Sequence, residues 1–177
     1  DQAQLKTMCD CYLRHGVTTV LATLMTNPKE LLLEAAAHCG NAKAPIRGIY
    51  LEGPFFGPAK KGAHDAQHLS PIDRDFFAAL DAAAGGSIRI VAVDPCLEGA
   101  EDFIRDLSKT KRVTLAHTPA TYDDAQKGFA AGASQVTHLF NAMKSLHHRD
   151  PGLLGAALVD ENVTCELIAD LIHLHPD

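Results

Sequence analysis

Ile46-Arg47-Gly48-Ile49-Tyr50-Leu51-Glu52-Gly53-Pro54 is the stretch that decides the fold. Its apolar run reads as a β-strand, which the Gly53-Pro54 step brings to an end. The strand closes on the carboxylate of Glu52. A carboxylate at the end of an apolar strand needs a partner, because an unpaired buried charge is costly. The stretch therefore predicts a strand that delivers Glu52 to a polar site at its carboxyl end.

Short apolar runs alternate with longer amphipathic segments along the rest of the chain. Expected N-caps of the helices are Asn27, Asp73 and Thr121. Two long loops are expected over 53–72 and 139–151. Strands are expected at 17–24, 46–52, 88–93, 113–117, 135–138 and 163–169. Helices are expected at 5–14, 28–39, 74–85, 97–107 and 122–131.

Repeated strand–helix units of this kind indicate a parallel sheet. The open doubly wound sheet is disfavoured, because no glycine-rich phosphate loop follows any of the strands. Several strands instead end on polar residues, namely Glu52, His117, His138 and Asp170. In a closed barrel such strand ends converge on the face that carries active sites. We therefore predict a TIM-type (β/α)8 barrel, with residues 1–177 forming a single partial catalytic domain that has about six strands and lacks the first and the last.

Composition narrows the classes of function. The 177 residues are 46% hydrophobic, and the formal net charge is -6. Binding to nucleic acid is disfavoured because the sequence has no basic run or stripe. No apolar run approaches the roughly 18 residues that span a bilayer, so no membrane partner is expected. The odd number of cysteines, five, argues against a disulfide framework and favours the reducing cytoplasm.

Glu52, His117 and His138 form a candidate metal site. Each stands at the carboxyl end of a different predicted strand. One carboxylate and two imidazoles would suit zinc or another divalent first-row metal with an open coordination position. The alternative is that each histidine is a hydrogen-bonded core residue and that Glu52 anchors a loop. Taken alone, the spacing leaves both readings open.

Several motifs resemble one enzyme family. The chain from about Gly16 onward looks like the N-acetylglucosamine-6-phosphate deacetylases of the amidohydrolase superfamily, specifically the central part of their barrel. The motifs that carry this resemblance are Leu51-Glu52-Gly53-Pro54-Phe55, Lys60-Lys61-Gly62-Ala63-His64, Thr137-His138-Leu139-Phe140-Asn141-Ala142-Met143, His148-Arg149-Asp150-Pro151-Gly152 and Ile168-Ala169-Asp170 with His173.

The resemblance implies roles for particular residues. Glu52, His117 and His138 would hold one divalent metal, with zinc first and iron or another first-row metal as the alternatives. His173 would also help to polarise the amide carbonyl. Arg149 suits a phosphate, since its planar guanidinium donates two parallel hydrogen bonds. Contacts to the sugar phosphate would come from Ala63, His64, Asn141, Ala142, Arg149 and His173.

The implied reaction is metal-dependent hydrolysis of the acetamide of N-acetylglucosamine 6-phosphate to glucosamine 6-phosphate and acetate. Its general acid/base would be an aspartate beyond Asp177, and the full-length protein would be a homodimer. Two alternatives stay open: an amidohydrolase acting on another amide, and a non-catalytic sugar-phosphate binder. The non-catalytic alternative is supported by two departures from the family pattern. Asp170-Leu171-Ile172-His173 lacks the family's glycine, and the His117 step reads Ala116-His117-Thr118-Pro119.

Overall fold

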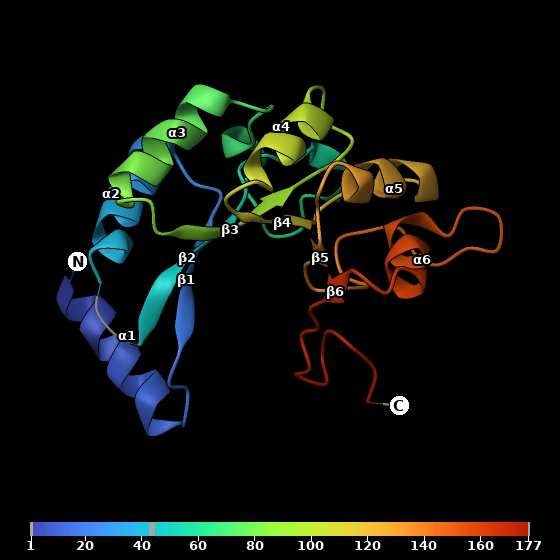
Figure 1. Ribbon diagram of the computed structural model, residues 1–177. Helices are drawn as coiled ribbons and strands as arrows, with labels where there is room; N and C mark the ends of the chain where they lie inside the picture. Colours follow the sequence, from blue (N-terminus) through green and yellow to red (C-terminus); the bar gives the residue numbers. More distant parts are fainter. Residues whose placement is uncertain (1, 43–44, 177) are drawn as a thin grey trace.

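The computed structural model describes residues 2–42 and 45–176, and these contain one parallel sheet. Its strands follow one another in space in the same order as in the sequence, and each pairs in parallel with the next (Figure 1). The strands are β1 (Val20–Met25), β2 (Ile46–Glu52), β3 (Ile88–Val93), β4 (Arg112–Leu115), β5 (Gln135–Val136) and β6 (Thr164–Cys165). The expectation of a partial (β/α) barrel with six strands is therefore confirmed; in the described residues the sheet does not close.

Helices connect successive strands. In Figure 1, α2 to α5 follow one another along one side of the sheet. In the described part of the chain, no helix combines the length and the apolar character needed to cross a membrane. The helices are α1 (Gln2–Arg14), α2 (Lys29–Gly40), α3 (Arg74–Ala83), α4 (Ala100–Leu107), α5 (Tyr122–Ala130) and α6 (Gly152–Val159), with short 3-10 turns η1 (Pro58–Lys60) and η2 (Ala66–His68).

The two faces of the sheet differ, because successive side chains of a strand point to opposite sides. One face belongs to the main apolar core, and its members include Ile49, Leu51, Val91, Val113 and Leu115. The other face carries a small apolar cluster and polar side chains. Its residues include Tyr50, Ala92, Ala116, Thr114, Gln135 and Thr137, all buried. Glu52 lies on this inner face, two residues after Tyr50 in β2.

The loop after β2 folds back over the carboxyl end of the sheet. Phe55 enters the main core and packs edge-on against Phe103, whereas Phe56 joins the inner cluster. Asp94, at the end of β3, fastens this loop: its backbone N–H donates to Phe55 O, and its carboxylate accepts from Gly57 N at 3.2 Å. The loop is thus held directly above the strand ends.

Several expected elements appear at their expected bounds. β2 and β3 coincide with 46–52 and 88–93, and Asp73 and Thr121 cap α3 and α5 as predicted. The expected cap at Asn27 is wrong. Pro28, whose side chain has no hydrogen-bond acceptor, occupies the N-cap position of α2, and the Asn27 amide nitrogen donates to Met25 O.

Two other differences lie near the end of the chain. Helix α6 was not expected, because most of its residues are buried and apolar and its sequence has no amphipathic pattern. The sixth strand covers only Thr164–Cys165, not 163–169.

Candidate metal centre

Glu52, His117 and His138 come together at the carboxyl end of the sheet. Glu52 is the last residue of β2, and each histidine lies two residues beyond the end of its strand. Both histidines have positive φ, 49° for His117 and 36° for His138. A left-handed conformation costs a residue with a Cβ about 1–2 kcal/mol. Local strain of this kind clusters at functional sites, where the surrounding structure enforces it.

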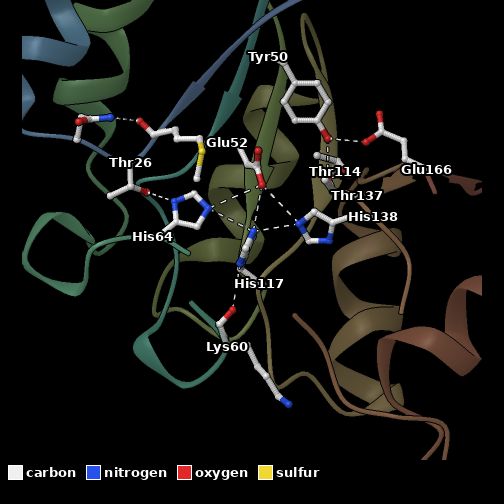
Figure 2. A network of polar contacts seen from close by, with 12 residues as sticks. Thr26, Tyr50, Glu52, Lys60, His64, Thr114, His117, Thr137, His138 and Glu166 are labelled. Atoms are coloured by element: carbon white, nitrogen blue, oxygen red, sulfur yellow. Dashed lines mark hydrogen bonds and ion pairs between the residues drawn. The ribbon is translucent and has the colours of Figure 1, made fainter. Parts of the chain in front are cut away.

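The ligand atoms of these residues meet at one point (Figure 2). Glu52 Oε1 lies 3.1 Å from His117 Nε2 and 3.4 Å from His138 Nε2. The two Nε2 atoms of His117 and His138 are 3.0 Å apart. The structure therefore brings together the three residues that the strand-end pattern singled out.

His64 joins them from the loop after β2. Its Nε2 lies 3.3 Å from His117 Nε2 and 3.7 Å from Glu52 Oε1. The residue is only 2% exposed. The resemblance placed His64 among the contacts to the sugar phosphate; the structure places it inside the donor group itself, where one ligand atom each from Glu52, His64 and His117 lies within 4.8 Å of the other two.

The donor set fits a divalent metal ion. Nitrogen and oxygen ligands of one tetrahedral zinc ion, at bond lengths of about 2.0–2.2 Å, lie roughly 3.3–3.6 Å apart. The contacts among Glu52, His64, His117 and His138 run from 3.0 to 3.7 Å. Closely facing imidazole nitrogens repel one another through their lone pairs unless a proton or a cation lies between them. Mixed imidazole and carboxylate donors are ligands that zinc and other first-row metals accept.

Glu52 is held in its ionised form. Burial acts to raise the pKa of its carboxyl, but the imidazoles of His117, His138 and His64 that contact it outweigh burial and bring the pKa far below its usual range. An ionised carboxylate is the form that binds a metal ion.

The orientation of His117 is fixed by its neighbours. Its Nδ1 lies 3.0 Å from the carbonyl oxygen of Lys60, which can only accept a hydrogen bond. Nδ1 therefore carries the hydrogen, and Nε2 keeps its lone pair free for a metal, which is the usual arrangement of a histidine ligand. Phe56 packs against the rings of both His117 and His64. His138 differs: its Nδ1 is buried and has no hydrogen-bond partner among the described residues.

A polar network continues down the inner face of the sheet (Figure 2). Tyr50 OH contacts Thr137 Oγ1 at 2.6 Å and donates to Glu166 Oε2 at 3.0 Å. Thr114 Oγ1 lies 2.8 Å from Thr137 Oγ1. Burial raises the pKa of both Tyr50 and Glu166. Beside this network lies an open cavity of about 400 Å³, whose lining includes Glu52 and His138.

Sequence reasoning missed Tyr50, Glu166 and Thr26, which contacts His64. The two-residue period of a strand could have found Tyr50, since it shares a face with Glu52. No sequence signal identified Thr26, because its partner lies 38 residues away in a loop.

Three other predicted contacts lie in loops next to the donor group. Ala63 precedes His64 and is exposed. Asn141 follows His138 closely, and its backbone N–H donates to His138 O at 2.9 Å. Ala142 is half-buried with φ 52°. The loop that carries Asn141 and Ala142 is therefore tied directly to a predicted metal ligand.

Arg149 and His173 are exposed, and their contacts given by the structure lie within their own turns. The backbone N–H of Arg149 donates to His147 Nδ1, and His173 Nδ1 lies 2.7 Å from Asp170 Oδ2. Backbone hydrogen bonds from His173 and Ile172, with the His173 side chain, lower the pKa of Asp170 to about 2. The structure does not bring Arg149 or His173 into the donor group.

The turn before His173 keeps a left-handed residue without the family's glycine. Leu171 occupies that position with φ 63° and a side chain that is 70% exposed. Its side chain therefore meets little obstruction, and Asp170 Oδ1 still accepts hydrogen bonds from the N–H groups of Ile172 and His173. The turn therefore keeps these two hydrogen bonds with leucine at this position.

Comparison with known proteins places the chain in a family. Its residues 2–177 match the amidohydrolase family. It is 39% identical to N-acetylgalactosamine-6-phosphate deacetylase from Escherichia coli O157:H7, over 92% of the chain and 45% of that protein. It is 36% identical to N-acetylglucosamine-6-phosphate deacetylase from Vibrio furnissii, over 97% of the chain and 45% of that protein. The chain thus spans less than half the length of these relatives.

A solved structure gives the same picture. An aspartate-to-alanine mutant of N-acetyl-D-glucosamine-6-phosphate deacetylase from Mycobacterium smegmatis, in complex with N-acetyl-D-glucosamine-6-phosphate, superposes with a TM-score of 0.86. The identity is 35%, and the match covers 90% of this chain and 43% of that one. The parallel strand–helix order, the donor group at the strand ends and these matches lead to one conclusion: the chain belongs to the amidohydrolase family.

Proposed function

We propose that the protein removes the acetyl group of N-acetylglucosamine 6-phosphate, giving glucosamine 6-phosphate and acetate. The observation that carries this proposal is the convergence of Glu52, His64, His117 and His138 in a chain similar to deacetylases of amino-sugar phosphates. Residues 1–177 would form the central part of a single catalytic barrel. As part of the same proposal, the full-length protein is a cytoplasmic homodimer with no nucleic-acid or membrane partner.

The amidohydrolase family is metal-dependent, and this chain has a group that could hold a metal. We infer that Glu52, His117 and His138 hold one divalent ion. Zinc suits this mixture of imidazole and carboxylate best, and iron or another first-row metal suits it next. When bound, such an ion lowers the pKa of a water molecule and polarises a carbonyl.

The chain's own residues bind and orient the substrate. Arg149 would bind the phosphate through hydrogen bonds. Further contacts to the sugar phosphate would come from Asn141, Ala142, Ala63 and His173. Fixing the acetamide in this way lowers the barrier by positioning the reacting groups. The resemblance gives His173 a part in polarising the amide carbonyl. The geometry favours His64 for that part, because its Nε2 lies in the buried donor group, whereas His173 lies in an exposed turn.

Proton transfer needs a further residue. The proposal assigns the general acid/base to an aspartate that residues 1–177 do not include. The Mycobacterium smegmatis structure is of an aspartate-to-alanine mutant in complex with N-acetyl-D-glucosamine-6-phosphate. This supports a functional aspartate in the proposed reaction. Such a residue takes the proton of the attacking water and passes it to the leaving amine.

One finding favours a second candidate substrate. The Escherichia coli O157:H7 relative, 39% identical, is a deacetylase of N-acetylgalactosamine 6-phosphate. The two sugars differ only in the configuration at C4, and the acetamide and the phosphate that the site would recognise are common to both. The second candidate is therefore deacetylation of N-acetylgalactosamine 6-phosphate.

Acetate release by the metal-loaded full-length protein separates these readings. The substrates are both N-acetylhexosamine 6-phosphates and N-acetylglucosamine without phosphate. We expect kcat/KM for N-acetylglucosamine 6-phosphate to exceed that for N-acetylglucosamine by about tenfold or more, since the phosphate is specifically recognised. It should also exceed that for the galactose epimer. A preference for the galactose epimer would establish the second candidate. Equal rates without phosphate, or no acetate from any substrate, would contradict both.

A further inference from the structure

Thr26 is a buried threonine in contact with His64. It follows the last residue of β1 and is 6% exposed. Its Oγ1 lies 2.8 Å from His64 Nδ1, on the side of the ring opposite to the donor group (Figure 2). The contact joins the end of β1 to the loop that carries His64.

Gly53 makes room for this contact. Its φ is +94°, and a Cβ at this position would lie 2.2 Å from Thr26 Oγ1. A side chain there would therefore displace the hydroxyl group. The glycine that follows β2 is thus favoured both by its backbone conformation and by the position of Thr26.

The partner of Nδ1 decides what Nε2 of His64 can do. A neutral imidazole carries one N–H, so a hydrogen bond accepted at Nδ1 leaves the hydrogen on Nε2. Nε2 of His64 faces Nε2 of His117 at 3.3 Å. The His117 atom holds a lone pair, because its Nδ1–H is directed to Lys60 O. Where no cation lies between the two atoms, that contact is favourable only if the His64 atom carries the hydrogen.

We propose that Thr26 is a positioning residue, whose hydroxyl donates to Nδ1 of His64 and keeps the ring hydrogen on Nε2. His64 then acts as a hydrogen-bond donor into the site and not as a fourth metal ligand. This leaves one coordination position open, as catalytic metal sites require. The benefit to catalysis rests on the function proposed above, in which the Nε2–H of His64 would reach the carbonyl oxygen of the acetamide.

The test compares Thr26→Val, which keeps the shape and removes the hydroxyl, with Thr26→Ser, which keeps the hydroxyl. Thr114→Val is the matched control, since it removes another buried threonine hydroxyl that contacts a side chain. In the full-length protein, three quantities are measured: zinc affinity by competition with a chelator, the ¹⁵N chemical shifts of the His64 ring, and kcat and KM.

In Thr26→Val we expect zinc affinity within about threefold of the wild type. Loss of a hydrogen-bond partner lowers metal affinity by roughly 10–100-fold only when the histidine that it contacts is itself a metal ligand. The ¹⁵N shifts should show loss of the single Nε2–H tautomer of His64. The value of kcat should fall roughly tenfold, as loss of one hydrogen bond near 1.4 kcal/mol implies, with KM little changed. Thr26→Ser should restore the Nε2–H tautomer of His64 and the wild-type kcat. Thr114→Val should leave the ¹⁵N shifts of His64 as in the wild type.

Three results would overturn the proposal. Zinc affinity lower by more than about tenfold in Thr26→Val would make His64 a metal ligand. An unchanged His64 tautomer in Thr26→Val would show that the Thr26 hydroxyl does not set it. A Thr26→Ser protein with the same tautomer and kcat as Thr26→Val would show the same. The tautomer is also measured without metal or substrate. If the wild-type protein releases no acetate, the proposed function is contradicted. The ¹⁵N spectra of the metal-free protein would still test whether Thr26 sets the tautomer of His64.

Discussion

His117 shows how much of a residue's chemistry is set by its neighbours. Its left-handed backbone and its Nδ1 contact with Lys60 O turn Nε2 toward Glu52, His64 and His138. The strand pattern predicted that His117 would end a strand at the site. It could not predict the tautomer, because the carbonyl that fixes it comes from a loop 57 residues earlier.

Gly53 allows a prediction at the same scale. Gly53→Ala should destabilise the protein by more than the roughly 1–2 kcal/mol of a left-handed alanine, because its Cβ would also collide with Thr26 Oγ1. Gly16→Ala is the matched control: Gly16 has φ +82° and nothing within 4 Å of an added Cβ. Denaturant unfolding measures both free energies. Equal losses would show that the space between Gly53 and Thr26 does not matter.

At the scale of elements, two of the three predicted caps and the apolar runs of β2 and β3 gave the correct positions. β2, β3 and the caps of α3 and α5 rest on local chemistry and were predicted. Helix α6 was missed because its burial comes from packing against other parts of the chain, α5 among them, and not from an amphipathic face. The Asn27 cap was wrong because α2 begins one residue later than expected, at Lys29, which puts Pro28 in the N-cap position.

The cap of α3 supports a pH-dependent prediction. Asp73 accepts from Phe76 N and pairs with Lys29 at 2.7 Å, and these contacts lower the pKa of Asp73 below its ordinary value. Asp73→Ala should cost about 1 kcal/mol of unfolding free energy at pH 7. Because the pKa is lower in the folded state, the contribution of the charge is present above the ordinary pKa and fades as pH falls through the lowered one.

Unfolding free energies of wild type and Asp73→Ala at pH 7 and at pH 3 check this. The difference in unfolding free energy between the wild type and Asp73→Ala should be smaller at pH 3 than at pH 7. Asp123→Ala serves as the comparison, since Asp123 lies in the first turn of α5 but is not its cap. A difference for Asp73→Ala that is the same at both pH values would contradict the ionic part of the cap.

At the scale of the whole molecule, the parallel order of the strands creates the site. Because β2, β4 and β5 run in the same direction, their carboxyl ends bring Glu52, His117 and His138 to one edge of the sheet. Fold class and these three residues followed from the sequence for that reason. The burial of His64 did not follow, because it depends on how the loop 53–72 folds back over the sheet.

The metal content of the full-length protein tests the central claim most directly. Elemental analysis would compare the wild type with the double variant His117→Ala and His138→Ala. The control is His15→Ala with His38→Ala: His15 is exposed, His38 is half-buried, and both lie outside the donor group. We predict about one divalent ion per chain in the wild type and the control, and less than about a tenth of that in the double variant. Equal metal content in all three proteins would contradict the metal centre at Glu52, His117 and His138.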